Sequence, residues 1–473
     1  MNDHIHTEFA GPLVIVGFGS VAQAALPLIL RHTRIDPRRI AIVTAEECGR
    51  EAALACGVTD FRVQPLTADT YRAILVPLLR PGAFLLNLSY DVSSLALIEL
   101  CHALDLPYLD ACIEPWAGGY YDTHLTPGER SNYGLREQAL AIDGVARPRR
   151  PTCVVAHGVN PGLISHFTKR ALLSMAAEAG LTATAPTQRE GWARLAQQLG
   201  IRAIHVAERD FQRAAQPKTP GEFVNTWSTG AFVGEGSQPA ELGWGTHEKA
   251  LPPTGRQHTL GSQAAIYLER PGFSVRVRSW TPLQGPYHGF LITHAESISI
   301  ADYLTLREGG HVVYRPTVHY AYHPCDDAVL SIFEYCGSGY TLQPRHRLLR
   351  DEIVAGTDEL GVLLCGHPRG VYWYGSRLTI EQARRLAPYN NATTLQTAAG
   401  VLGGVIWAIE NPGRGVVEPE AMDYERVLQI AEPYLGEMVG AWGTWDPLQG
   451  RERFFAEDLD RDDPWQFRNV LVV

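Results

Sequence analysis

The chain has 473 residues, of which 45% are hydrophobic and 19% charged, a globular composition that excludes disordered, collagen-like and small disulfide-stabilised proteins. Forty-one Lys and Arg against fifty-one Asp and Glu give a formal net charge of −10, which argues against a nucleic-acid partner and favours a small cationic one. The length predicts two or three domains.

The first residues and the cysteines are typical of a cytoplasmic protein. No basic region followed by an apolar stretch opens the chain, so we expect no secretory signal. The longest non-polar run, residues 398–409, is shorter than the roughly 18 residues that cross a bilayer, so we expect no membrane association. The eight cysteines form no CxxC pair and have no His at ligand spacing. We therefore expect reduced thiols and no metal site.

Short apolar segments alternate with helical stretches in the first 110 residues, a pattern typical of βαβ units and a parallel sheet. The expected strands are 13–16, 39–44, 61–63, 83–88 and 107–110. A run of prolines and arginines at 147–151 then interrupts the pattern. This places a Rossmann-type domain, with a doubly wound parallel sheet, over residues 1–155.

Residues 156–394 are expected to form a second, α+β domain with an open antiparallel or mixed sheet. Its expected strands are 265–268, 274–279, 288–292, 312–314 and 317–322, whereas the Gly, Ser and Thr in 226–244 predict loops and turns. Residues 395–409 predict an apolar helix. Residues 411–473 are expected to form a C-terminal helical segment that ends in an acidic tail near 457–463.

The expected strand 13–16 is followed directly by Gly17-Phe18-Gly19-Ser20-Val21-Ala22. This is a G-x-G-x-x-A fingerprint between a strand and an expected helix over 21–31. The first glycine allows a tight turn, the second lets a pyrophosphate approach, and the helix N-terminus at Ser20 and Val21 attracts phosphate. The pattern predicts dinucleotide binding, the alternative being a βα turn that merely contains glycine.

The end of the second strand predicts NAD rather than NADP. There a carboxylate normally binds the ribose hydroxyls, or an arginine binds the additional phosphate. The strand ends at Thr44, an acid follows at Glu46, and no arginine appears before Arg50.

Polar residues also follow the fourth and fifth strands: Asn87, Ser89 and Asp91 after the fourth, and Asp110 and Ala111 after the fifth. Ligands bind beyond the carboxyl ends of parallel strands, so these residues are candidates for cofactor contacts. Asx turns or helix caps explain the same residues equally well.

Several segments resemble the bacterial homospermidine synthases, which are relatives of saccharopine dehydrogenase. They are VIVGFGS from Val14, NLSYD from Asn87, YLDACIEPW from Tyr108, HGVNPG from His157, WST from Trp227, EG from Glu235 and HAESIS from His294. The resemblance extends from the first strand to the glycine-rich helix near 400. Many dehydrogenases share the fingerprint and the wider saccharopine dehydrogenase group shares the Val-Asn-Pro-Gly turn, so the Trp, Glu and His segments are the specific ones.

The resemblance implies a reaction that is redox in its steps but not overall. NAD would take a hydride from the carbon that bears one amine of putrescine, and the resulting imine would lose ammonia by hydrolysis. A second putrescine would condense with the aldehyde, and the returned hydride would give homospermidine. Spermidine could replace one putrescine as the aminobutyl donor. NAD would be regenerated in each turnover and would act as a prosthetic group.

A diamine carries a positive charge at each end in water, but hydride leaves only from a carbon beside an uncharged amine. The binding site must therefore hold one end as an ammonium and take a proton from the other, which requires carboxylates at two depths of the site. In the resemblance, Glu208 and Glu235 are candidates near the reacting amine, and Asp91 and Glu114 would hold the distant ammonium. Any one of these acids, taken alone, would be read as a surface charge.

The resemblance adds three further candidates to the catalytic set. The indole of Trp227 would attract ammonium and iminium charge, although an isolated Trp is more often a core residue. His294 would relay protons, because an imidazole titrates near neutral pH. Asn160, in the turn between the domains, could hydrogen-bond an amine or the nicotinamide amide, although its place before a proline is equally typical of a turn.

Two alternatives remain open. One is a reductase of the saccharopine dehydrogenase or carboxynorspermidine dehydrogenase type, which would consume a nicotinamide cofactor and need an Arg or Lys for a carboxylate substrate. The other is an NAD-responsive binding protein without enzymatic activity. The resemblance also implies a homodimer, and a return of the helix near 395–410 to the first domain.

Overall fold

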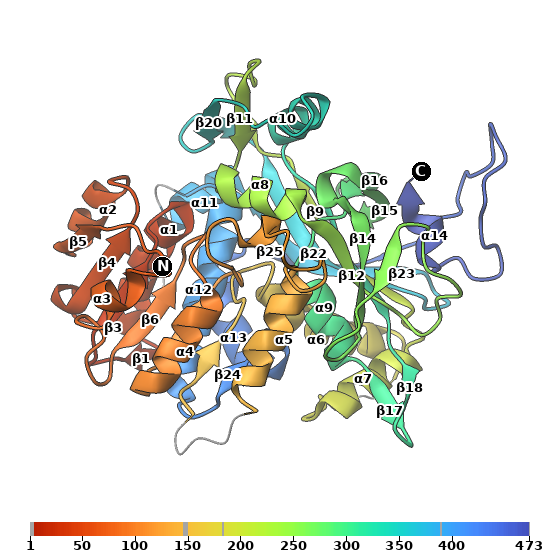
Figure 1. Ribbon diagram of the computed structural model, residues 1–473. Helices are drawn as coiled ribbons and strands as arrows, with labels where there is room; N and C mark the ends of the chain where they lie inside the picture. Colours follow the sequence, from red (N-terminus) through yellow and green to blue (C-terminus); the bar gives the residue numbers. More distant parts are fainter. Residues whose placement is uncertain (1–3, 145–149, 182–183, 388–389, 473) are drawn as a thin grey trace. The chain divides into compact units, whose positions relative to one another are not determined.

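The computed structural model describes residues 4–144, 150–181, 184–387 and 390–472, and the chain divides into two compact units (Figure 1). Unit 1 comprises Met1–Leu163, Thr226–Ala231 and Ile380–Gly436, and unit 2 comprises Ile164–Asn225, Phe232–Thr379 and Glu437–Val473. Residues 145–149, which include most of the proline and arginine run expected at a boundary, lie outside the described residues.

Unit 1 is built on a parallel sheet of seven strands within the described residues, in the order β24-β8-β7-β6-β2-β4-β5. The strands are β2 (Leu13–Val16), β4 (Ile40–Thr44), β5 (Asp60–Val63), β6 (Phe84–Asn87), β7 (Tyr108–Asp110), β8 (Cys153–Val154) and β24 (Val416–Val417). The five strands predicted in the first 110 residues are confirmed. The order changes direction between β2 and β6, as in a Rossmann fold.

The helices of unit 1 connect or follow these parallel strands in the chain. They are α1 (Ser20–His32), α2 (Arg50–Ala55), α3 (Tyr71–Leu75), α4 (Ser94–Leu104), α5 (Asn132–Ile142), α11 (Ile380–Leu386), α12 (Ala392–Glu410) and α13 (Tyr424–Ala431), with 3₁₀ turns η1 (Pro37–Arg39), η2 (Gly119–Tyr121), η4 (Pro419–Ala421) and η5 (Glu432–Tyr434). A short parallel pair, β1 (Thr7–Glu8) and β3 (Thr33–Arg34), lies outside the main sheet.

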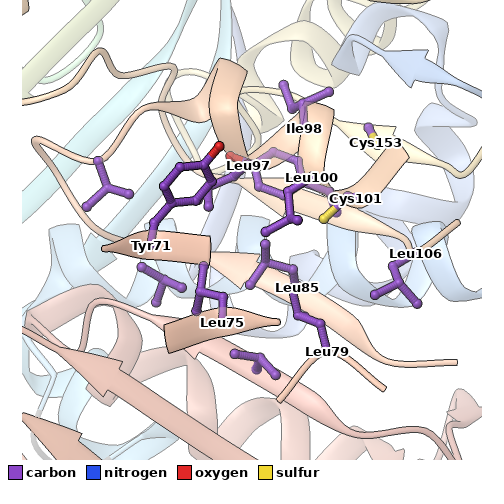
Figure 2. Close-up of a cluster of buried hydrophobic side chains, with 14 of the residues drawn as sticks. Tyr71, Leu75, Leu79, Leu85, Leu97, Ile98, Leu100, Cys101, Leu106 and Cys153 are labelled. Carbon is purple, nitrogen blue, oxygen red and sulfur yellow. The ribbon is translucent and has the colours of Figure 1, made fainter. Parts of the chain in front are cut away.

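The core of unit 1 forms where α4 covers the sheet (Figure 2). Leu97, Ile98 and Cys101 of α4 are fully buried with Leu85 of β6. Their spacing of three and four residues places them on one face of the helix, which is the face that the sheet removes from water.

The helix α12 confirms the apolar helix predicted at 395–409 and packs against α1 and α13. Its length and mean hydropathy of 1.4 would suit a membrane span, but 89% of the apolar window is buried inside the protein. A capping box between Asn391 and Thr394 starts the helix. We therefore describe α12 as a core helix.

Unit 2 contains a mixed sheet of eleven strands within the described residues. Its main path is β13-β14-β12-β19-β9-β22-β23-β25, and β15, β16 and β26 branch from it. The strands are β9 (Ala203–Asp210), β12 (Pro239–Gly243), β13 (Gly255–Gln257), β14 (Ala265–Pro271), β15 (Arg276–Thr281), β16 (Gly285–Phe290), β19 (Thr317–His323), β22 (Thr357–Cys365), β23 (Val371–Thr379), β25 (Glu437–Gly443) and β26 (Leu471–Val472). Only the β9 and β19 pair is parallel among them, which confirms the predicted mixed sheet.

Shorter elements and helices complete unit 2. The helices are α6 (Leu163–Glu178), α7 (Arg189–Gln198), α8 (Thr229–Ser237), α9 (Ala295–Tyr303), α10 (Asp326–Gly337) and α14 (Phe467–Val470), with η3 (Gly272–Ser274). The first residues of α8, up to Ala231, belong to unit 1. The short strands are β10 (Arg213–Ala214), β11 (Glu222–Asn225), β17 (Leu306–Glu308), β18 (His311–Tyr314), β20 (Arg345–Leu348) and β21 (Ile353–Ala355). The helix α9 packs on β12 and β19.

The prediction of loops and turns throughout 226–244 is wrong, because this segment contains α8 and β12. The glycine at 236 serves packing rather than a turn: a Cβ there would lie 2.2 Å from the ring of Phe273. Tertiary packing thus overrides the low helix propensity of the segment. The region after residue 411 also differs from the expected helix and free tail, since β25 joins the sheet and Asp460 pairs with Lys249.

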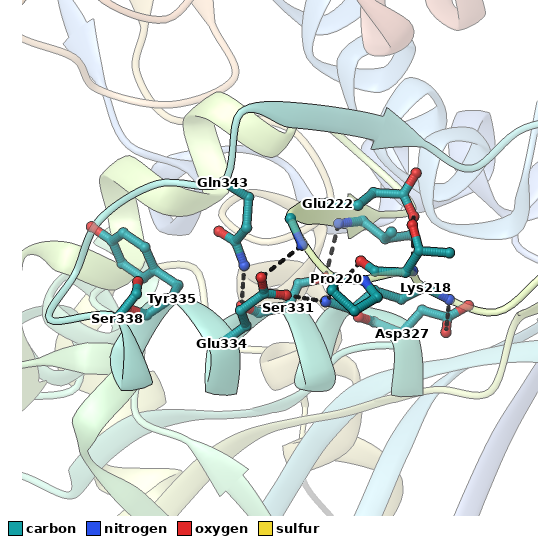
Figure 3. A network of polar contacts seen from close by, with 12 residues as sticks. Lys218, Pro220, Glu222, Asp327, Ser331, Glu334, Tyr335, Ser338 and Gln343 are labelled. Carbon is teal, nitrogen blue, oxygen red and sulfur yellow. Dashed lines mark hydrogen bonds and ion pairs between the residues drawn. The ribbon is translucent and has the colours of Figure 1, made fainter.

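A network of polar contacts fixes β11, the strand that ends directly before Thr226 (Figure 3). The backbone N–H of Val224 donates to Ser331 Oγ at 2.9 Å, and that of Gly221 donates to Glu334 Oε1 at 2.7 Å. Lys218 forms an ion pair with the other oxygen of Glu334. The helix α10 therefore holds the segment that leads to residues 226–231.

The close approach of two glycines in unit 1 gives a stability prediction. A Cβ on Gly400 of α12 would lie 1.9 Å from the carbonyl oxygen of Gly158, so Gly400→Ala forces these backbones apart. Overpacking of this kind costs about 1–3 kcal/mol, and we expect the melting temperature to fall by several degrees. In the control Gly337→Ala, at the end of α10, a Cβ meets no atom within 4 Å. Equal melting of both variants by circular dichroism would contradict the prediction.

Candidate functional site

The turn between β2 and α1 has the geometry of a phosphate cradle. Gly17 has φ +79°, and a Cβ there would lie 2.7 Å from the backbone of Ser89. At Gly19, by contrast, a Cβ would meet no atom within 4 Å. The first N–H groups of α1, at Ser20 and Val21, have no partner within the helix and are available to an anion. These residues fit a dinucleotide pyrophosphate.

The end of β4 lies next to this turn in the sheet, because β4 pairs with β2. Thr44 is buried at the end of the strand. Arg50 forms an ion pair with Glu47, donates to the carbonyl oxygen of Phe61 at 3.2 Å and lies over the Phe61 ring. This arginine is already committed to protein partners, which agrees with the preference for NAD inferred from the sequence.

The residues at the end of β6 and β7 form a buried hydrogen-bonded chain. Ser89 Oγ donates to Asn87 Oδ1 at 2.5 Å, Asn87 Nδ2 donates to Tyr108 Oη at 3.3 Å, and Tyr108 Oη donates to Asp110 Oδ2 at 2.8 Å. Burial raises the pKa of Asp110 to about 6. The structure thus joins three predicted cofactor residues and adds Tyr108 to them.

The loop that carries Asn160 is attached to the same chain. The Ala156 N–H donates to Asp110 Oδ1 at 2.6 Å, so both oxygens of Asp110 serve protein groups. Ala111 adjoins this loop: a Cβ on Gly158 would come within 3.8 Å of the Ala111 Cβ. Asn160 is partly exposed and precedes a cis proline. Asp110 therefore positions the turn of Asn160 at the carboxyl edge of the sheet.

The segment of Trp227 belongs to unit 1 and lies beside the loop that follows β6. Asn391 Nδ2 donates to the carbonyl oxygen of Thr226 at 2.5 Å, which fixes the segment to the start of α12. A Cβ on Gly230 would lie 3.2 Å from the hydroxyl of Tyr90. Trp227 itself is half-buried.

The two acids expected to hold a distant ammonium differ in their surroundings. Asp91 is exposed in the turn after β6, with φ +61°, and partial burial raises its pKa. Glu114 is buried, and its backbone bonds to Ser94 at both the N–H and the carbonyl oxygen. Both belong to unit 1.

In unit 2, His294 lies between two carboxylates. It directly precedes α9; its Nε2 is 3.2 Å from Glu235 Oε2 of α8, and its Nδ1 is 3.2 Å from Glu296 Oε1 of α9. Burial by itself would lower the pKa of His294, but the charges of Glu296 and Glu235 and their hydrogen bonds raise it to about 10. The expected titration near neutral pH is therefore wrong for the free protein, in which His294 is an imidazolium.

Glu208 is part of the same cluster through Tyr320. The parallel register pairs Val206 of β9 with Tyr320 of β19, so Glu208, two residues along β9, is on the same face as Tyr320. The Tyr320 hydroxyl donates to Glu208, and the Tyr320 ring lies 4.4 Å from the ring of His294. Burial and the charge of Glu208 hold the pKa of Tyr320 well above its usual value, so this phenol remains a donor.

A buried anchor fixes the residue that precedes His294. Thr293 Oγ1 donates to Glu241 Oε2 at 2.8 Å, and Glu241 Oε1 is 3.1 Å from His258 Nε2. Glu241 of β12 and Thr293 are fully buried, and His258 nearly so. The pair of Glu241 and His258 thus determines where the turn before α9 runs.

The structure brings the predicted residues Glu208, Glu235 and His294 together in unit 2 and the predicted cofactor residues together in unit 1. Sequence reasoning did not assign Glu296 and Tyr320. Glu296 lies in a segment quoted for the resemblance, and Tyr320 lies in a correctly predicted strand, but which face of that strand meets an acid is determined by the neighbouring strand.

Comparisons with known proteins match both units. The chain matches the saccharopine dehydrogenase NADP binding domain over residues 13–154 and the saccharopine dehydrogenase C-terminal domain over residues 158–444. It is 51% identical to the homospermidine synthase of Blastochloris viridis, over 99% of this chain and 98% of the relative. It is 48% identical to that of Mesorhizobium japonicum, with the same coverage.

A solved structure agrees with these relatives. The homospermidine synthase of Legionella pneumophila in complex with NAD is 47% identical and superposes with a TM-score of 0.92, covering 100% of both chains. The agreement extends over the Rossmann-like unit and the mixed-sheet unit, so the fold predicted from the sequence is confirmed.

The imidazolium between two carboxylates gives a pH prediction. Because the pKa of His294 is raised from 6.5 to about 10, its pairing stabilises the folded protein fully below pH 6.5, and this contribution is lost as the pH rises towards 10. Glu296→Gln removes the largest favourable charge, so we expect a lower pKa for His294. NMR titration of imidazole-labelled protein, with the signal assigned by its loss in His294→Gln, measures this. Titration near 6.5 in the parent protein would contradict the arrangement.

Proposed function

This chain belongs to the homospermidine synthase family of saccharopine dehydrogenase-like enzymes, and from that membership we propose how its residues carry out the family's reaction. The enzyme is a transferase that uses NAD. It moves an aminobutyl group from one putrescine, or from spermidine, to the amine of a putrescine, with release of ammonia. The observation that carries the assignment of roles is the cluster of Glu208, Glu235, His294 and Glu296.

The overall balance is two putrescines converted to homospermidine and ammonia. One C–N bond breaks when the imine is hydrolysed, and one C–N bond forms when the second amine condenses with the aldehyde. Bound NAD supplies the reversible hydride transfer, accepting a hydride from the carbon beside the amine and returning it to the new imine. The remaining chemistry is proton transfer and charge stabilisation by side chains.

Unit 1 would hold the cofactor at the carboxyl edge of its sheet. The Gly17 turn, the free N–H groups of Ser20 and Val21, and the open space at Gly19 suit the pyrophosphate. Thr44, Asn87, Ser89, Asp110 and Ala111 line the strand ends that follow. Asn160, in the turn that Asp110 holds, would orient the nicotinamide amide or the reacting amine.

The cluster in unit 2 would bind the reacting end of the diamine. It contains three carboxyl groups and one imidazolium, so it attracts a cation, and its burial strengthens that attraction. In the described part of the chain, neither Glu235 nor Glu296 pairs with an Arg or Lys. A cationic substrate therefore suits the cluster better than the carboxylate substrate that a saccharopine-type reductase requires.

Proton transfers follow from the states of these groups. Glu235 would accept the proton that the substrate ammonium must lose before hydride departs. His294, protonated at neutral pH, would donate to the departing ammonia and later to departing water. Glu208, oriented by the Tyr320 hydroxyl, would hold the amine in place.

Trp227, Asp91 and Glu114 complete the proposed set. The indole would stabilise ammonium and iminium charge by about 0.5–2 kcal/mol without abstracting a proton. Asp91 and Glu114 would hold the distant ammonium of the diamine. The family membership also leads us to propose a cytoplasmic homodimer.

The proposed function predicts products without net redox change. Pure enzyme, putrescine and a catalytic amount of NAD should yield homospermidine and ammonia in equal amounts, with no lasting absorbance from NADH. Mass spectrometry and an ammonia assay measure the products. Steady consumption of added NADH would instead identify the reductase alternative, and NAD binding without either product would identify a binding protein.

Substitution of Trp227 tests its electrostatic role. We expect Trp227→Ala to lower kcat at least tenfold while the affinity for NAD changes little, because the indole acts on positive charge in the substrate. Trp227→Phe keeps an aromatic face and should retain more activity than the alanine variant. Equal losses of NAD affinity and turnover would show that the residue is structural.

A further inference from the structure

A cavity of about 380 Å³ lies in unit 2 between the β15–β16 hairpin and the segment that follows β25. The hairpin contributes Arg278, Pro286 and His288 to its lining, and the segment contributes Trp445, Asp446 and Arg451. None of the residues of the acidic cluster lines it. Its volume is in the range of small-molecule sites.

The hairpin side of this cavity carries the positive charge of Arg278. Arg278 and His288 are direct partners in the antiparallel register, so both side chains lie on the same face of the hairpin and line the cavity. Arg278 donates one hydrogen bond, to the carbonyl oxygen of Leu471 at 2.9 Å, and forms no ion pair with a described residue. Arg276, on the same face, lies over the rings of Phe290 and Phe333.

The opposite wall compensates this charge only in part, through the charge of Glu457. Arg451 is held by Glu457 and by the carbonyl oxygens of Pro447 and Asn469, so Glu457 is already paired. Asp446 accepts the N–H of Leu448 at 2.7 Å and forms no ion pair with Arg278. Partial burial lowers the pKa of Arg278 and the charge of Arg451 lowers it further, whereas the charge of Glu457 raises it. The pKa of His288 is lowered by burial and by all three arginines.

We propose that this cavity binds an oxyanion, the carboxylate or phosphate group of a small ligand, on the guanidinium of Arg278. The planar fork of an arginine matches both groups, and a bound anion would offset the repulsion between the charges of Arg278 and Arg451, which both line the cavity. Trp445 and Pro286 provide apolar surface for the rest of the ligand. The charge is opposite to that of the acidic cluster, so the cavity is a separate site that rejects polyamines.

The test is calorimetric titration of the NAD-loaded enzyme with sodium phosphate and, separately, with sodium citrate, at an ionic strength kept constant with chloride. We expect saturable binding of one anion per chain. Arg278→Gln should weaken it about tenfold or more, because a charge-assisted fork is lost. Asp446→Asn should strengthen it several-fold, since a nearby negative charge is removed while the amide oxygen still accepts from Leu448.

The control is Arg194→Gln, which removes an exposed arginine paired with Glu308 elsewhere in unit 2 and should leave binding unchanged. His288→Gln should also weaken binding and serves as a second variant if Arg278→Gln does not fold. Saturation by phosphate alone, or by citrate alone, would identify the ligand group. Absence of saturation with both anions, or equal affinity in the parent and Arg278→Gln, would overturn the proposal. Turnover of putrescine without added anion should be unchanged in Arg278→Gln, so failure here is distinct from failure of the proposed function.

Discussion

The ion triad of Glu235, His294 and Glu296 is the constraint on which the rest of unit 2 depends. A buried imidazolium is unfavourable unless charge and hydrogen bonds compensate it, and here both ring nitrogens have a carboxylate at 3.2 Å. Those carboxylates come from α8 and α9, and Tyr320 of β19 links the ring of His294 to Glu208 of β9. The mixed sheet and its helices therefore hold an acidic centre that prefers a cation.

Unit 1 is proposed to bind an anion, the dinucleotide. A dinucleotide is anionic, and the unit offers it backbone N–H groups and glycine space rather than basic side chains. The chain from Ser89 through Asn87 and Tyr108 to Asp110 then fixes the strand ends and the loop of Asn160. In the function proposed above, unit 1 binds the anionic dinucleotide and the cluster of unit 2 binds the reacting amine, while Asp91 and Glu114 of unit 1 hold the distant ammonium.

The sequence predicted the elements whose pattern is local. The fingerprint after residue 16 and the alternating apolar segments indicated the parallel sheet, because turn chemistry and periodicity act over a few residues. Residues 226–244 were missed because α8 is stabilised by contacts such as Gly236 against Phe273, which composition does not reveal. The triad was only partly predicted: its high pKa for His294 arises from Glu296 as much as from Glu235, and Tyr320 reaches Glu208 only through the register of β9 and β19.

The buried pair of Glu241 and His258 has a dynamic consequence. The hydrogen bond between His258 Nε2 and Glu241 Oε1 is almost completely removed from water. Exchange of its proton with deuterium therefore requires the structure around β12 to open. Thr293 is tied to this pair, and the imidazolium of His294 follows it directly in the chain. The position of His294, the proton donor that we propose, is thereby tied to the folding of β12.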